Sequence, residues 1–71
     1  MMAYYRKKAI QEIIPWEVNM PMALVSISEA DKNNGSPKFG DMIAFNPKDK
    51  TDMWLIAEEF FSNNYELVSE H

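Results

Sequence analysis

The stretch GSPKFGDMIAFNPKDKTDMWLIAEEFF, residues 35–61, decides the fold that we expect for this chain. Two short apolar runs, residues 42–45 and residues 53–56, lie on either side of the polar segment KDKTD. Asn46 and Pro47 end the first run, because the residue before a proline prefers extended geometry and proline favours a turn. The two runs therefore predict a β-hairpin around a polar loop.

The segment AEEFFSNN, residues 57–64, predicts a short helix directly after the hairpin. Ala57, Phe60 and Phe61 form an apolar stripe at helical spacing, and Glu58 and Glu59 lie in the first turn, where the helix dipole favours acidic groups. Residues 65–68, YELV, then predict a last strand with two apolar side chains on one face.

The N-terminal half predicts two further strands and one helical turn. Residues 9–16, AIQEIIPW, are rich in β-branched side chains, and Pro15 places that strand at a sheet edge or at its own end. Residues 23–28 alternate apolar and polar side chains as a second strand. Ser28 is a suitable N-cap for one helical turn, which Asn34 and Gly35 can end with a positive φ.

The elements together predict the α+β class in a single small domain, residues 1–71. We expect a small antiparallel sheet of about five short strands, either flat or curled, with one short helix near the C-terminus. The chain has 71 residues and no cysteine, so its core is thin and no disulfide can reinforce it. Such a chain relies on packing alone or on self-association, which makes a homo-oligomer possible.

Charge and hydropathy narrow the class of partner. The formal net charge is −4, and the three adjacent cations at residues 6–8 form too small a patch for phosphate recognition, so nucleic acid is not an expected partner. No run approaches the roughly 18 apolar residues of a membrane helix, and the N-terminus lacks the apolar region of a signal peptide. We therefore expect a cytoplasmic protein that does not bind a membrane.

The residues that enzymes use for catalysis are scarce. There is no cysteine, and the single histidine is the terminal His71, so a nucleophile with an adjacent base is not expected. Two pairs of acidic residues are expected to be exposed to solvent: Asp49 with Asp52, and Glu58 with Glu59. The segment DKNNGS fails the calcium-loop pattern at Ser36 and Met42, and two glycines cannot form a phosphate-binding loop. We expect no enzyme activity, no cofactor and no metal site.

The aromatic side chains divide into two expected groups. Trp16, Trp54, Phe60 and Tyr65 are expected in the core, since a chain this small needs them there. Phe39 is a candidate for exposure, and so is Phe61. Either one would be an ordinary anchor for a protein partner.

Residues 28–65 resemble a stretch found in small proteins of tailed bacteriophages and prophages. The shared positions are Ser28, Asp31, Gly35-Ser36-Pro37-Lys38, Gly40-Asp41-Met42-Ile43-Ala44, Asn46-Pro47, Asp52, Trp54-Leu55, Ala57, Phe61 and Asn64. The opening YYRKKAIQEIIPW is similar to that of many short phage proteins, apart from Ala9 and Pro15. Phe45 replaces a residue that is usually polar. The resemblance implies a phage origin and action in the cytoplasm of the host cell, without implying an activity.

Three functions are compatible with these features. The first is a non-catalytic phage accessory protein that binds a host protein, for example a defence or regulatory factor. The second is an oligomeric binder of a small molecule such as a nucleotide, with polar contacts from Lys38, Asn46 and Lys48. The third is a minor virion or assembly component. The candidate binding residues are Lys38, Phe39, Asp41, Asn46, Lys48 and Phe61, although Asp41 can also bond neighbouring backbone amides within a turn.

Overall fold

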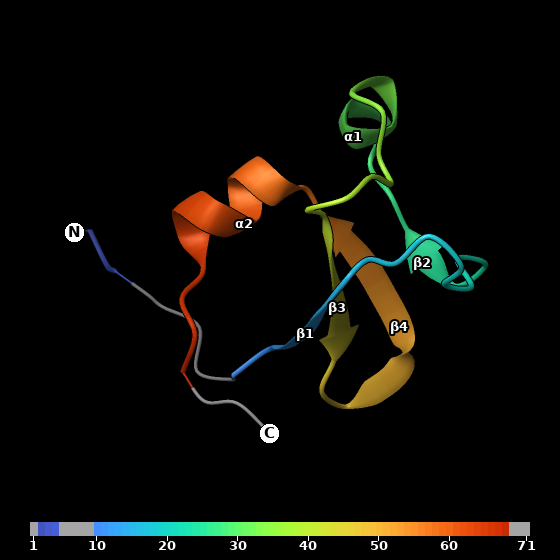
Figure 1. Cartoon of the computed structure of the whole chain (residues 1–71). Helices are drawn as coiled ribbons and strands as arrows, with labels where there is room; N and C mark the ends of the chain where they lie inside the picture. The colour runs from blue at the N-terminus through green and yellow to red at the C-terminus, as the bar shows by residue number, and fades with distance from the viewer. Residues whose placement is uncertain (1, 5–9, 69–71) are drawn as a thin grey trace.

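The computed structural model describes residues 2–4 and 10–68. Ala9, the predicted start of the first strand, and His71 lie outside the described residues. Within residues 2–4 and 10–68, four strands and two short helices follow one another (Figure 1). They are β1 (Glu12–Pro15), β2 (Val25–Ser26), α1 (Glu29–Asn33), β3 (Met42–Asn46), β4 (Asp49–Ile56) and α2 (Glu58–Asn64).

The strands form one open, mixed sheet in the order β1-β3-β4-β2. β3 pairs antiparallel with β1 and with β4, whereas β2 runs parallel to β4. The α+β class and the helix near the C-terminus are thus confirmed. The sheet differs from the expected one in having four strands, one parallel pair and no closure. Pro15 is the last residue of β1, which is an edge strand of the sheet. Proline has no backbone N–H to donate, and an edge strand tolerates that loss.

The β3–β4 hairpin is confirmed, but its loop is tighter than predicted. Asn46 already pairs with Asp49, so most of the expected polar loop belongs to β4. The side chain of Asn46 explains the early closure: its Oδ1 accepts from the backbone N–H of Lys48 at 2.9 Å, and its Nδ2 donates to Asp52 at 3.0 Å. The side-chain hydrogen bonds of Asn46 therefore shorten the turn, and most of the polar residues after it become part of β4.

The predicted strand at residues 65–68 is wrong, because that segment forms no regular element. Tyr65 instead turns back against α2, and its ring stacks on Phe61 with 5.4 Å between the centroids. The predicted strand at residues 23–28 shortens to Val25–Ser26. A turn closed by the bond from the N–H of Val25 to the carbonyl of Met22, at 3.1 Å, takes up its first residues.

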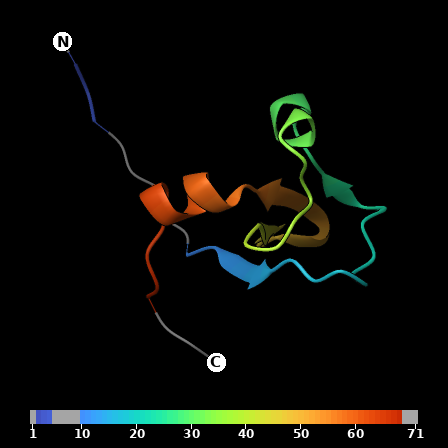
Figure 2. The same ribbon diagram turned by 45° about the horizontal axis from the view of Figure 1, so that its top comes forward.

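Both helices follow the capping signals in the sequence. Ser28 caps α1, since its Oγ accepts from the N–H of Asp31 at 3.2 Å. Gly35 follows α1 with φ of 93°, which supplies the left-handed residue expected after a helix. Both helices lie near the end of the sheet where β4 ends, with α2 leaving on one side and α1 on the other, as the turned view shows (Figure 2).

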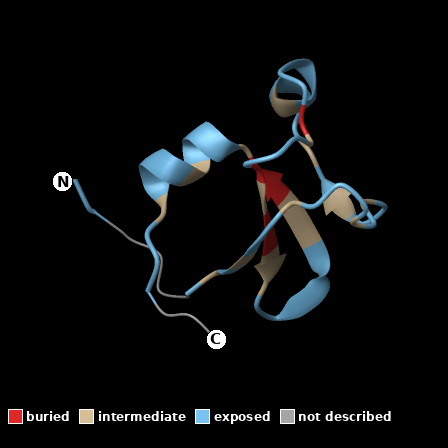
Figure 3. Cartoon of the chain, viewed as in Figure 1, coloured by how far each residue is buried: buried red, intermediate tan, exposed pale blue. Residues whose placement is uncertain are grey.

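The core is aliphatic and small. In the part of the chain that the structure describes, four apolar residues are buried, and they are neighbours on the central strands (Figure 3): Ile43, Ala44, Leu55 and Ile56. Of the aromatic residues expected in the core, Trp16, Trp54 and Tyr65 are only partly buried. The prediction for Phe60 is wrong, because 55% of its surface is exposed. The central hairpin alone fills the small core, so large rings remain at the surface.

Within the described residues, no helix has the length and apolar character needed to cross a bilayer.

Candidate functional site

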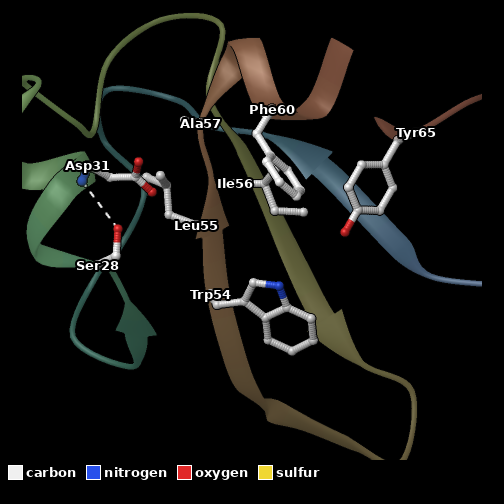
Figure 4. A pocket seen from close by; sticks show the side chains of 8 residues that line it. All are labelled: Ser28, Asp31, Trp54, Leu55, Ile56, Ala57, Phe60 and Tyr65. Carbon is white, nitrogen blue, oxygen red and sulfur yellow. Dashed lines mark hydrogen bonds between the residues drawn. The ribbon is translucent and has the colours of Figure 1, made fainter. Parts of the chain in front are cut away.

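A surface hollow of about 350 Å³ lies beside the end of β4 and between the two helices (Figure 4). We call it the aromatic groove, because three of its lining residues carry rings. Its lining residues are Ser28, Asp31, Trp54, Leu55, Ile56, Ala57, Phe60 and Tyr65.

The floor of the aromatic groove comes from β4. Trp54 pairs across the sheet with Ala44, and cross-strand partners point to the same face. A residue as small as Ala44 leaves the space above it free for the indole. Ile56, two residues further along the strand, points to the same face as Trp54. The β3–β4 register therefore places a large ring and an aliphatic side chain side by side.

The far wall comes from α2 and the residue that ends it. Tyr65 lies 5.4 Å from Phe61 with the rings 13° from parallel, and 6.4 Å from Phe60 with the rings tilted by 58°. The N–H of Tyr65 also donates to the carbonyl of Phe61 at 3.0 Å. These contacts fix the Tyr65 ring, whereas Phe60 presents an exposed ring to the solvent side of the groove.

The polar end of the aromatic groove is Asp31 of α1. Its backbone is held firmly, since its N–H donates to Ser28 and its carbonyl accepts from the N–H of Ser36 at 2.9 Å. Its carboxylate makes no hydrogen bond or ion pair with any residue that the structure describes. Asp31 is also the only ionisable side chain among the lining residues apart from the phenol of Tyr65. The aromatic groove thus has one exposed ring, that of Phe60, and one negative charge, whose carboxylate lies on the Leu55 side of β4, away from the rings (Figure 4).

A second carboxylate, Asp41, holds this arrangement together from inside the molecule. Its side chain is fully buried. Oδ2 accepts from the hydroxyl of Ser36 at 2.7 Å and from the N–H of Lys38 at 3.0 Å, and Oδ1 accepts from the N–H of Glu58 at 3.0 Å. Ala57 precedes α2 without a side-chain cap of its own, so Asp41 supplies the missing acceptor from 17 residues away.

These partners also determine how Asp41 titrates. Burial raises the pKa of the Asp41 carboxyl, but the hydrogen bonds from Ser36, Glu58 and Lys38, together with the charge of Lys38, lower it by more. The net result is a pKa below the ordinary value of 3.8. The ionised form is therefore the form that the fold favours.

The pH dependence of stability should report this shift. Because the pKa of Asp41 is lower in the folded state than in the unfolded state, its stabilising contribution is complete above the unfolded value of 3.8 and is lost as the pH falls through the folded value. We expect the free energy of unfolding, measured with urea from neutral pH down to about pH 3, to fall less steeply in Asp41→Asn than in the wild-type chain. Equal slopes for the two proteins would contradict the assignment.

The structure separates the predicted binding residues into three places. Asn46 and Lys48 lie at the β3–β4 turn, and Lys38 precedes the opposite end of β3, so one chain does not bring these polar groups together. Lys38 lines a second hollow of about 290 Å³ with Glu58 and Glu59.

Of the three remaining predicted residues, Asp41 is buried and its carboxylate bonds within the fold, so it is not accessible to a partner, and the other two are aromatic. Phe39 is 76% exposed and packs edge-on against Trp16, with 5.5 Å between the ring centroids. Phe61 is partly buried and supports Tyr65 from α2. Phe39 thus has the exposure that an anchor needs, while Phe61 contributes to the groove through its neighbour.

The sequence-based prediction did not include Asp31 among the candidate binding residues and placed Trp54, Phe60 and Tyr65 in the core. One signal for the groove was present in the sequence: so short a chain cannot bury this many rings in one thin core. The four residues of the acidic pairs, Asp49, Asp52, Glu58 and Glu59, are exposed, as expected.

Among the described residues, no group of three or more His, Cys, Asp or Glu side chains could hold a metal ion. No protein-family model, curated protein or solved structure matches this chain, so its function has to be inferred from the groove itself.

Proposed function

We propose that this chain is a non-catalytic accessory protein that binds another protein through the aromatic groove. The observation that carries the proposal is the convergence of Trp54, Phe60 and Tyr65 on one accessible hollow. Tryptophan and tyrosine are enriched among the residues that dominate binding energy at protein interfaces, where they act in pockets that exclude water. Surface rings held by fixed contacts also lose little conformational freedom on binding.

The origin of the partner belongs to the same proposal. The resemblance of residues 28–65 to small phage proteins supports a phage origin and a host protein as the partner, met in the host cytoplasm. The net charge of −4 suits a partner with a basic surface, because opposite charges speed the encounter of two proteins. The partner is expected to cover more than the groove, since a stable interface buries about 800 Å² on each side.

The proposal is tested by comparing two substitutions of exposed apolar residues. The tagged chain is used to capture proteins from a bacterial lysate, and the affinity for a captured protein is then measured with purified components. We expect Phe60→Ala to weaken binding about 30-fold, which corresponds to the roughly 2 kcal/mol of an interface hot spot. Phe60 is 55% exposed, so its removal should leave the fold intact.

Leu24→Ala is the matched control, because Leu24 is 61% exposed and lies outside the groove. It should bind like the wild-type chain. A captured protein that binds both variants equally well would contradict the groove as the docking site. Failure to capture any bacterial protein would contradict the proposed function as a whole.

A second candidate is a small-molecule binder, favoured by the volume of the groove. About 350 Å³ falls within the range of ligand pockets, roughly 300–1,000 Å³. A ligand that binds only the folded state would raise the melting temperature. The separation of Lys38 from Asn46 and Lys48 leaves this candidate without converging polar contacts in one chain, so protein binding remains the better-supported function.

A further inference from the structure

We propose that Asn34 is a modification site, at which the side-chain amide is lost as ammonia through a cyclic imide formed with the backbone nitrogen of Gly35, and that local opening of α1 sets the rate. The inference is independent of the proposed function, because it concerns the end of α1 and not the aromatic groove. It follows from the residue pair itself, from the bonds that close it and from the weak anchoring of α1.

Asn34 and Gly35 provide the reacting groups. Of the six asparagines in the sequence, only Asn34 precedes a glycine, which has no side chain to hinder attack by its nitrogen. Asn34 is exposed, and no described residue bonds its side-chain amide. Apart from its chain neighbours, no described atom lies within 4 Å of the position that a Cβ of Gly35 would occupy. Water and the leaving ammonia therefore have free access to the site.

The reaction balances with water alone. The Gly35 nitrogen loses its proton to solvent base and bonds to the side-chain carbonyl carbon of Asn34, while the C–N bond of the side-chain amide breaks and ammonia leaves. Water then opens the imide at one of its two carbonyl groups, which restores an N–H and gives either aspartate or isoaspartate. The net change is one water consumed, one ammonia released and one negative charge gained.

The folded state holds the reacting groups apart. The N–H of Gly35 donates to the carbonyl of Lys32 at 3.0 Å, so its nitrogen is not free to lose the proton. The ψ angle of Asn34 is 7°, which turns that nitrogen away from the Asn34 side chain, whereas ring closure requires the two to be nearly eclipsed. The next amide, that of Ser36, is fixed by its bond to the carbonyl of Asp31 at 2.9 Å. The reaction therefore requires these bonds to open.

α1 is well suited to open on its own. It has five residues, none of them buried, and it projects from the end of the sheet (Figure 1, Figure 2). A helix this short is unstable without support, and Ser28 supports it by accepting from the N–H of Asp31. Segments with few buried contacts open without unfolding of the core. Local opening of α1 is therefore the route by which Asn34 reacts.

The two products differ in their effect on the fold. Isoaspartate carries the main chain through its side-chain carbon, which lengthens the backbone between α1 and Ser36, whose hydroxyl bonds the buried Asp41. Aspartate keeps the backbone and adds a charge in the hollow that Asn34 lines with Lys38 and Glu58. Isoaspartate is thus the product expected to disturb the buried bonds of Asp41.

The test follows the full chain during incubation in neutral buffer and, in parallel, in urea. Peptide mapping by mass spectrometry measures the conversion at each asparagine and separates aspartate from isoaspartate. We expect conversion at Asn34, with isoaspartate among the products, and a slower reaction in buffer than in urea because the folded state protects the site. Asn34→Gln should give no product there, since the longer side chain disfavours the ring.

The route is tested with two variants of similar expected cost to stability. Ser28→Ala removes the cap of α1 and should raise the rate of conversion in buffer about five-fold, the factor by which loss of a typical cap raises the population of the open state. Ile14→Ala weakens the sheet at β1 and should leave that rate unchanged, because it does not affect the bonds of α1.

The inference would be overturned by any of the following results. No conversion at Asn34 in buffer once the chain in urea has converted fully, or products without isoaspartate, would exclude the imide at this site. Equal rates in buffer and in urea would show that the fold does not protect Asn34. Equal rates for Ser28→Ala and Ile14→Ala in buffer would show that opening of α1 does not control the reaction.

Discussion

Replacing Asp41 with alanine is expected to remove about 3–5 kcal/mol from the free energy of unfolding. The substitution leaves the hydroxyl of Ser36 and the N–H groups of Lys38 and Glu58 without their acceptor in a buried place. Each unsatisfied buried group costs about 1–3 kcal/mol, and a domain of this length has a total stability of roughly 4–10 kcal/mol. Asp41→Ala is therefore expected to be largely unfolded at moderate urea concentrations.

The expected loss is measured by urea unfolding of Asp41→Ala, with Asp49→Ala as the control. Asp49 also accepts two hydrogen bonds, from the N–H of Thr51 at 3.0 Å and from its hydroxyl at 2.6 Å, but it is exposed and bonds only within its own turn. We expect Asp49→Ala to unfold close to the wild-type midpoint. If the two alanine variants lose the same stability, then burial and long-range bonding at Asp41 do not determine its effect.

Replacing Ile43 with alanine is expected to have the second largest effect, a loss of about 3–4 kcal/mol. Ile43 is 1% exposed and is one of the four apolar side chains that are buried among the described residues. It also lies between β1 and β4, opposite Ile14 on one side and Leu55 on the other. The cavity left by its side chain cannot be filled by a core this small, so the loss should not fall at the low end of the usual range of about 2–5 kcal/mol for such substitutions.

Ile14→Ala provides the control, because it removes the same atoms from the neighbouring strand at a residue that is 36% exposed. Its loss should be about 1 kcal/mol, since part of that side chain already contacts water. In thermal unfolding a difference of 1 kcal/mol corresponds to roughly 4–8 °C for a domain of this size, so the two variants should be clearly separated. Similar melting temperatures would show that the core extends beyond the four buried residues.

Local signals in the sequence predicted much of the fold. The hairpin followed from two apolar runs and a turn at Asn46 and Pro47, and α1 followed from Ser28 and Gly35. These features depend on neighbours within a few residues. The predicted strand at residues 65–68 failed because the contact of Tyr65 with Phe61 determines the path of the chain there. The parallel pairing of β2 depends on a partner far along the chain, which alternation of side chains does not specify.

The candidate site was less predictable than the fold. The sequence predicts that Asp41 can bond a neighbouring backbone amide, and its Oδ2 accepts from the N–H of Lys38 at 3.0 Å. The bond from Glu58 to the same carboxylate joins segments 17 residues apart, and residue types alone do not reveal it. The aromatic groove was missed for a similar reason: exposure of Phe60 depends on how little of α2 faces the sheet, which only the assembled fold determines.

The position of Asp41 outside the groove has a consequence for the evolution of this protein. Asp41 fixes the start of α2, which carries one wall of the groove, yet it is not among the lining residues. Under the proposed function, a substitution at Phe60 would alter what is recognised without removing this anchor. Adaptation to a new target would then not require a new fold, because the buried scaffold stays the same.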